Sequence, residues 1–164
     1  MKTSVLFILL FFGWLAPTHA QNVPENIILK NLNGEEVSFK EFVKGGPVII
    51  SFWATWCKPC QSELEALKDI QDDWKDKIRI IAVTIDDARA TAKVKSLVKG
   101  KKWPFEILFD TNKELYKALN ISAVPHIMII NENKIVWTHS GYMPGNEITV
   151  VEKALELAEK KKLP

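Results

Sequence analysis

VIISFWATWCKPC, residues 48–60, joins an uncharged run to the two cysteines of this 164-residue chain. The run from Val48 to Ala54 is rich in β-branched and aromatic residues, which predicts a strand buried on both faces. Such a strand belongs in a sheet that has helices on each side. Cys57 and Cys60 follow within six residues, so both sulfur atoms lie where this strand ends.

A helical pattern begins directly after the cysteines. Charged residues separate apolar residues that recur every three to four positions, at Leu64, Leu67, Ile70 and Trp74. Pro59 would lie in the first helical turn, where the missing N–H of proline costs nothing. We therefore expect Cys57 at the point where a buried strand ends and a helix begins.

The other segments alternate between strand and helix patterns. A hairpin is predicted around Asn33-Gly34, a strong turn signal, and a second around residues 131–133. The predicted elements are strands at 27–39 (hairpin), 78–85, 105–109, 126–130 and 134–138, and helices at 88–99 (ending at Gly100), 113–119 and 148–161. This order predicts an α/β fold in which right-handed crossovers place helices on both faces of the sheet.

The first 20 residues have the layout of a secretory signal peptide. Lys2 precedes an apolar run, Val5 to Ala16, and Thr18 and Ala20 supply the small residues of a cleavage site. The run is shorter than the roughly 20 apolar residues of a spanning helix, so we expect cleavage after Ala20 rather than a retained membrane anchor. Residues 21–164 would then form one domain, long enough for a hydrophobic core.

The charge pattern excludes some classes of partner. The formal net charge is +2, and acidic and basic residues are mixed along the chain. This balance implies neither a nucleic-acid nor a membrane-surface partner, and the basic clusters at 99–102 and 160–162 are interpreted as solvated helix ends. We expect a monomer without a stable membrane span after processing.

The close spacing of the cysteines is poorly suited to a purely structural role. A disulfide that closes a four-residue ring contributes about 2 kcal/mol of stability, against about 3 kcal/mol for a fifteen-residue ring. Structural zinc needs four ligands, and only His126 and His139 remain beside the cysteines after processing. Sulfur with imidazole suits copper, so a copper-binding or copper-delivery protein using Cys57, Cys60 and His126 stays open as an alternative.

A redox role explains the placement of the cysteines better. The start of a helix presents unpaired N–H groups and partial positive charge, which favour a thiolate. With Lys58 adding a cation, we expect the pKa of Cys57 to lie below the free-thiol value of roughly 8.5. Cys57 would attack a partner disulfide, and the more buried Cys60 would then attack Cys57 and release the reduced partner. The reverse sequence would make a disulfide-forming oxidase.

At this point a family resemblance is visible. The pattern Phe52-Trp53-Ala54-x-Trp56-Cys57-x-Pro59-Cys60 resembles the strand and active-site loop of the thioredoxin superfamily. The hairpin sequence IILKNLNGEEVSF (27–39), the signal peptide and the extra strand and helix at 105–119 resemble its exported TlpA/ResA-like branch. The resemblance covers residues 21–164.

This resemblance implies a thioredoxin fold and thiol–disulfide exchange without a metal or other cofactor. The implied location is the periplasm. The implied partners are disulfide-containing exported proteins and an upstream thiol electron donor, with reduction favoured over oxidation. It also implies that Trp56, Lys58, Pro59 and Val124 contact the substrate. Trp56 would shield the thiol, whereas Trp53 is expected in the core.

Three further positions follow from the resemblance. The sequence AVPHIMII (123–130) places the family's cis-proline, which faces the cysteines, at Pro125; Val124 stands where many reducing members have threonine. Glu63, three residues after the second cysteine, would accept the proton of Cys60. The alternative is a surface glutamate that merely favours the helix dipole. Ser51 stands where cytosolic thioredoxins have a buried aspartate, and a serine cannot take a full proton.

Peroxidases of the same fold are the last alternative. The resemblance implies that such enzymes have a threonine three residues before the nucleophilic cysteine. Ala54 stands at that position, and Thr55 lies one residue too late. The hydroxyl that would polarise a peroxide is therefore misplaced, so no peroxidase activity is expected.

Overall fold

The computed structural model describes residues 21–161, so the predicted signal peptide lies outside the described residues. One eight-stranded sheet has the order β1-β8-β7-β4-β5-β6-β2-β3. The strands are β1 (Gln21–Asn22), β2 (Ile28–Asn31), β3 (Glu36–Ser38), β4 (Val48–Trp53), β5 (Arg79–Thr84), β6 (Glu106–Phe109), β7 (His126–Asn131) and β8 (Lys134–Ser140). The chain has the predicted α/β order, and the sheet is mixed.

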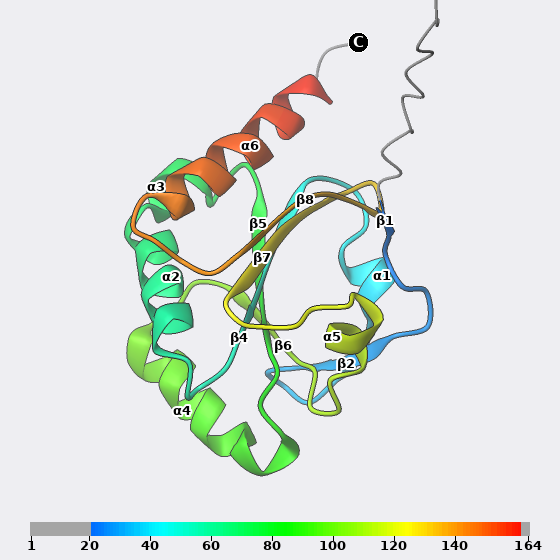
Figure 1. The fold of residues 1–164 in the computed structure, drawn as a ribbon, viewed down its shortest axis with the longest axis vertical. Helices are drawn as coiled ribbons and strands as arrows, with labels where there is room; N and C mark the ends of the chain where they lie inside the picture. Colours follow the sequence, from blue (N-terminus) through cyan, green and yellow to red (C-terminus); the bar gives the residue numbers. More distant parts are fainter. Residues whose placement is uncertain (1–20, 162–164) are drawn as a thin grey trace, which may run out of the picture.

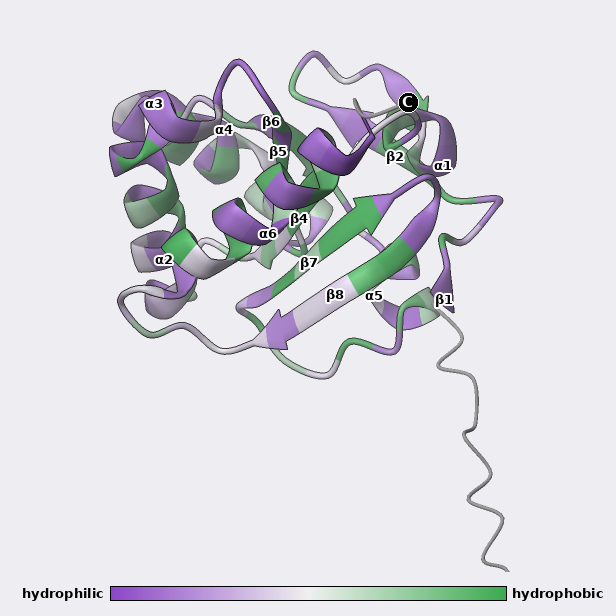
Figure 2. Cartoon of the chain, turned by 90° about the horizontal axis from the view of Figure 1, so that it is seen from above, coloured by the Kyte–Doolittle hydropathy of each residue, from purple (hydrophilic) through white to green (hydrophobic). Residues whose placement is uncertain are grey.

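Helices cover both faces of this sheet, as Figures 1 and 2 show, with α2, α4 and α6 on one side and α1 and α5 on the other. The helices are α1 (Phe39–Phe42), α2 (Lys58–Asp69), α3 (Gln71–Trp74), α4 (Thr91–Lys101, after the 3-10 turn Ala88–Ala90), α5 (Glu114–Ala118) and α6 (Asn146–Lys160). Among the described helices, none combines the length and the apolar character that crossing a membrane requires.

The central strand β4 positions the cysteine loop at the middle of the sheet. Every residue of β4 is buried, as its uncharged sequence predicts. It pairs in parallel with β5, with Ile50 opposite Ile81, and antiparallel with β7, with Phe52 opposite His126. The carboxyl end of β4 is thus fixed on both sides, and it carries the loop that leads to Cys57.

The ends of several helices differ from the sequence-based expectations. Phe39 begins α1 with its side chain fully buried in the core, although its N–H still donates to the carbonyl of Ile27 across the hairpin. The helix after the cysteines is interrupted at Ile70, where the short α3 starts. Gly100 lies inside α4, and the left-handed residue that ends this helix is Lys102, with φ 53°.

The closing helix α6 is also displaced from its prediction. It starts at Asn146, and its buried residues are Val150, Val151 and Ala154. Leu155 and Ala158, which were expected on the buried side together with Val151, are only partly buried. The apolar stripe of α6 is therefore centred closer to its N-terminus, where the helix contacts α2, β4 and β7.

Candidate active site

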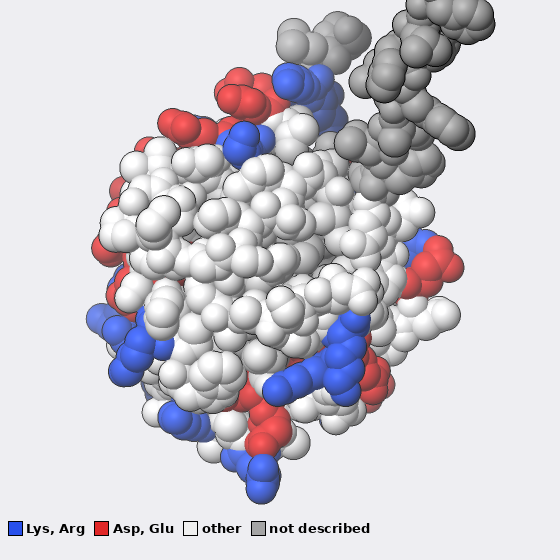
Figure 3. All heavy atoms as spheres, viewed as in Figure 1, with Lys and Arg blue, Asp and Glu red and all other residues white. Residues whose placement is uncertain are grey.

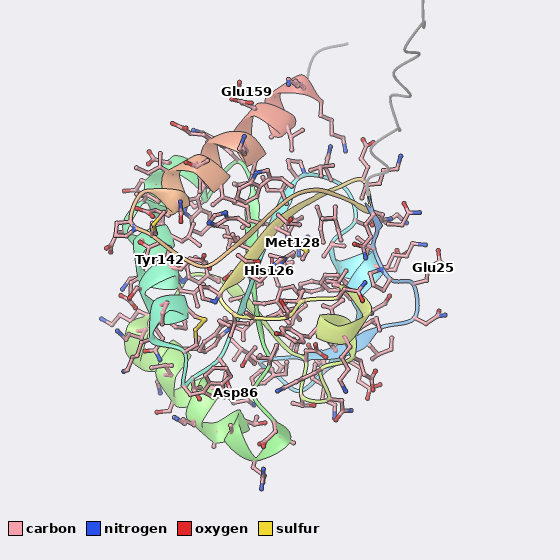
Figure 4. All side chains as sticks on the ribbon, viewed as in Figure 1. Glu25, Asp86, His126, Met128, Tyr142 and Glu159 are labelled. Carbon is pink, nitrogen blue, oxygen red and sulfur yellow. A yellow bond between two sulfur atoms is a disulfide. The ribbon has the colours of Figure 1, made fainter. Side chains whose placement is uncertain are left out.

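Cys57 and Cys60 are joined by a disulfide at the junction between β4 and α2, with their Cα atoms 5.3 Å apart. Cys57 is the residue that caps the start of α2, and its Sγ accepts the backbone N–H of Cys60 at 3.2 Å. Pro59 lies in the first turn, as expected. Cys57 is 4% exposed and Cys60 is fully buried, which is the predicted order of access. Figure 4 shows the disulfide in yellow at the start of α2.

Two tryptophans that flank the loop occupy opposite environments. Trp53 is fully buried and packs edge-on against Trp103, with ring centroids 5.0 Å apart. Trp56 is 63% exposed, directly beside Cys57. Lys58 and Pro59 are also exposed. The structure therefore places these three exposed side chains around the disulfide, where they are open to a binding partner.

A hydrogen-bonded anchor beneath the loop was not anticipated from the sequence. The carboxylate of Asp86, 5% exposed, accepts the backbone N–H and the hydroxyl of Thr55, both at 2.8 Å, and the hydroxyl of Thr84 at 2.7 Å. Asp86 follows β5 just as Thr55 follows β4, and these strands run parallel. The carboxyl ends of the two strands meet at one edge of the sheet. The position of Thr55 and Asp86, each two residues after its strand, could therefore have indicated their contact.

Pro125 lies at the same edge of the sheet as the cysteine loop. The Val124–Pro125 peptide bond is cis, as the resemblance implied. Because Phe52 pairs with His126, the residue before His126 faces the end of β4. Pro125 is buried and its carbonyl accepts the N–H of Gly141 at 2.8 Å, while Val124 is half-buried. The sheet register thus brings the Cys57 loop, Val124 and Pro125 together.

Glu63 is buried, so the interpretation as a surface glutamate was wrong. Its side chain projects from α2 toward β4, is 1% exposed, and its Oε2 accepts the hydroxyl of Ser51 at 2.7 Å. Burial raises the pKa of Glu63 to about 7, and the charge of Glu147 adds to the rise, whereas the hydrogen bond from Ser51 lowers it. Glu63 therefore exchanges a proton near neutral pH.

Two residues at the start of α6 and in the loop before it complete the surroundings of Glu63. The pKa of Tyr142 is raised first by burial and then by the negative charges of Glu147 and Glu63. Figure 4 shows Tyr142 in the loop that precedes α6, beside α2. The sequence pattern had indicated no role for Glu147.

His126 has a partner other than the cysteines. Its Nδ1 lies 2.7 Å from the hydroxyl of Ser140, and burial together with the neighbouring His139 lowers its pKa. Within residues 21–161, no group of three or more His, Cys, Asp or Glu side chains is arranged to hold a metal ion. The geometry therefore adds no support to the copper alternative.

Known proteins are similar to this chain in sequence and in structure. The chain is similar to the thioredoxin-like protein YneN of Bacillus subtilis, 34% identical over 131 residues that cover 79% of this chain and 74% of YneN. It is 30% identical over 149 residues to the thiol-disulfide oxidoreductase ResA of Halalkalibacterium halodurans, covering 90% and 81% of the two chains. The solution structure of an uncharacterized thioredoxin-like protein from Porphyromonas gingivalis matches with a TM-score of 0.71 and 40% identity, covering 84% of this chain and 92% of that one.

The fold and the Cys-x-x-Cys disulfide define a thioredoxin-like thiol–disulfide oxidoreductase. Residues 20–139 match the AhpC/TSA family, and the chain belongs to that family. The expectations of a thioredoxin fold and of an oxidoreductase class are thereby confirmed.

Proposed function

We propose that the protein, in its reduced form, reduces disulfides of exported proteins through Cys57 and Cys60. The observation that carries this proposal is the position of Cys57 at the cap of α2, where its sulfur already accepts a backbone N–H. A thiolate at this position receives the same hydrogen bond and the partial positive charge of the helix start. The nucleophile is therefore the sulfur nearer the solvent.

The first step forms one bond and breaks one. The thiolate of Cys57 attacks one sulfur of the partner disulfide, which gives a mixed disulfide and expels the other partner sulfur as a thiolate. That thiolate takes up a proton from solvent. Trp56, Lys58, Pro59 and Val124 surround the position of attack and are proposed to hold the partner chain.

The second step needs a base for Cys60, and Glu63 is proposed to be that base. Glu63 accepts the Cys60 proton, and the resulting thiolate attacks Cys57. The second partner sulfur leaves, and the Cys57–Cys60 disulfide seen in the structure is regenerated. An upstream dithiol donor then reduces this disulfide for the next cycle.

Location and direction rest on the sequence. The pattern of residues 1–20 supports export, and the TlpA/ResA-like resemblance supports the periplasm and the reducing direction. Residues 21–164 are proposed to be one domain. An equilibrium potential near that of thioredoxin, roughly −270 mV, would support reduction, and one near that of DsbA, roughly −120 mV, would support the oxidase alternative.

Peroxide reduction is not part of the proposal, although the chain belongs to the AhpC/TSA family. Ala54 stands three residues before Cys57 and has no hydroxyl. The hydroxyl of Thr55 donates to the buried carboxylate of Asp86. It is therefore held by Asp86 rather than directed at a peroxide.

The test is the reduction of insulin disulfides with dithiothreitol as the reductant. Cys57→Ser is expected to lose activity entirely, and Cys60→Ser should accumulate mixed disulfides that can be isolated from the native compartment. Ser62→Ala, an exposed change on the same helix, should behave like the wild type. Equal rates for the wild type and Cys57→Ser would refute the proposed function.

A further inference from the structure

A groove of about 750 Å³ runs between α2 and α4, directly beside the exposed ring of Trp56. We call it the α2–α4 groove. The residues that line it recur every three to four positions along α2 and α4, so one face of each helix lines the groove. Its lining includes Trp56, Lys58, Lys93, Leu97, Gly100 and Lys101.

The α2–α4 groove is positively charged. Three lysines line it, and none of its lining residues is acidic. Within the described residues, Lys58 and Lys93 have no carboxylate within ion-pair distance, and Lys101 contacts Glu65 at 3.5 Å. Figure 3 shows Lys and Arg side chains gathered at the lower left, over α2 and α4.

Two carboxylates near the groove, Asp86 and Glu65, already have partners, and Asp69 lies further along α2. Asp86 lies behind Thr55, where three hydrogen bonds hold its oxygens. Glu65, on the continuation of the groove along α2, lies 3.9 Å from Lys68 and accepts the indole N–H of Trp103 at 2.6 Å. Neither carboxylate therefore neutralises Lys58 or Lys93.

The groove is also open to a bulky occupant. Gly100 lies inside α4, where glycine is unfavourable relative to alanine. Apart from its chain neighbours and the backbone of its own helix, no described heavy atom lies within 4 Å of the position that its Cβ would take. Leu97 is half-buried and offers an apolar surface on the same helix. With the Trp56 ring, the groove therefore combines an apolar contact area with three cations.

We propose that the α2–α4 groove binds an acidic segment of the substrate protein, next to the disulfide that Cys57 attacks. This inference rests on the proposed function and adds the chemistry of the partner. Carboxylates of the segment pair with Lys58, Lys93 and Lys101, and an apolar residue between them packs on Trp56 and Leu97. A polypeptide suits the site because the groove begins at the neighbour of Cys57 and lies between two helices.

The test compares two synthetic peptides that share one intramolecular disulfide. Several glutamates flank the disulfide in the first peptide, and glutamines replace them in the second. We expect the wild type to reduce the acidic peptide with a kcat/KM about fivefold to tenfold higher, because each of the three partly exposed ion pairs contributes modestly. Raising the salt concentration should remove most of this preference.

Variants on α4 test whether the preference for the acidic peptide depends on the groove. Lys93→Gln/Lys101→Gln should lose it, whereas Lys95→Gln/Lys99→Gln, with the same change of net charge on the same helix, should keep it. Gly100→Leu should also lose it, because the new side chain fills the groove without removing a charge. Both lysine variants should reduce the glutamine peptide at the wild-type rate.

The possible failures are distinguishable. If the wild type reduces neither peptide, the proposed function is wrong. If it reduces both at equal rates, or if both lysine pairs weaken the preference equally, the disulfide chemistry stands and the docking inference is overturned.

Discussion

The carboxyl group of Glu63 illustrates how burial sets the chemistry of a single side chain. A glutamate one helical turn after Cys60 would ionise near its usual pKa of 4.5 on the surface. Here the side chain is buried against β4, and the uncharged form is favoured until the pH reaches about 7. The carboxyl can therefore release or accept a proton under the conditions in which thiol exchange takes place.

Glu63→Gln should remove a pH dependence from the second step of the reaction. The ionised form of Glu63 accepts the proton of Cys60, so in the wild type the rate of release of the mixed disulfide should rise with pH through about 7. In the variant this rise should vanish, and the rate should fall by about 10²-fold, within the usual range for a lost general base. Rapid-mixing measurements would follow the rate at which the mixed disulfide formed by Cys57 is released at each pH.

Two outcomes test this role of Glu63 more closely. Ser51→Ala removes the hydrogen bond that favours the ionised carboxylate, so it should move the inflection to higher pH without abolishing it. An unchanged pH profile in Glu63→Gln would show that Glu63 does not deprotonate Cys60. The role would then be limited to packing.

The same carboxyl group makes stability depend on pH. Its pKa is about 7 in the folded state and near 4.5 in the unfolded chain, so the folded protein binds the proton more tightly. Its cost to stability is absent below about pH 4.5, grows between the two values, and reaches about 3 kcal/mol above pH 7. Urea titrations should show that Glu63→Gln raises the free energy of unfolding by about 1–2 kcal/mol relative to the wild type, and only above about pH 7. The gain is smaller than the full cost because the buried amide group of glutamine offsets part of it.

At the scale of elements, the loop between β4 and α2 depends on the neighbouring strand. Asp86, at the end of β5, holds Thr55 through its backbone N–H and its hydroxyl. A further hydrogen bond joins the side chain of Gln61 on α2 to the carbonyl of Thr55 at 2.9 Å. The position of Cys57 is thus set jointly by two parallel strands and the first turn of α2.

Asp86→Asn should loosen this loop. The carboxylate of Asp86 accepts three hydrogen bonds, whereas the amide nitrogen of asparagine can only donate. The substitution would therefore leave a buried polar group without a partner, at a cost of about 1–3 kcal/mol. We expect that loss in the free energy of unfolding, with slower insulin reduction. Asp87→Asn, the adjacent and exposed position, is the control. Equal effects at the two positions would show that the Asp86 anchor has no special role.

At the scale of the whole molecule, stability is concentrated in the centre of the sheet. Ile50 on β4 is fully buried between the two helical layers, whereas Val136 on the outer strand β8 is 42% exposed. Ile50→Ala should cost about 2–5 kcal/mol in the free energy of unfolding. Val136→Ala should change it by no more than about 0.5 kcal/mol. Denaturant titrations would compare the two, and similar losses would contradict this distribution of stability.

Much of the architecture was predictable because it depends on local patterns. The uncharged run at 48–54 indicated a strand buried on both faces, and the apolar spacing after Cys60 indicated an amphipathic helix. Errors fell at helix ends. Phe39 ends the hairpin and also begins α1, and the helix expected to end at Gly100 continues to the left-handed residue two positions later.

The sequence by itself determined the class of chemistry, because two thiols separated by two residues at a strand–helix junction have few other uses. It also named Glu63 and Pro125, though only through resemblance. Tertiary structure alone decided that Glu63 is buried against Ser51, that Asp86 holds Thr55, and that the lysines of α2 and α4 face one groove. The physical reason is that pKa, hydrogen bonding and surface charge depend on which distant segments share a space, and the sheet topology alone brings those segments together.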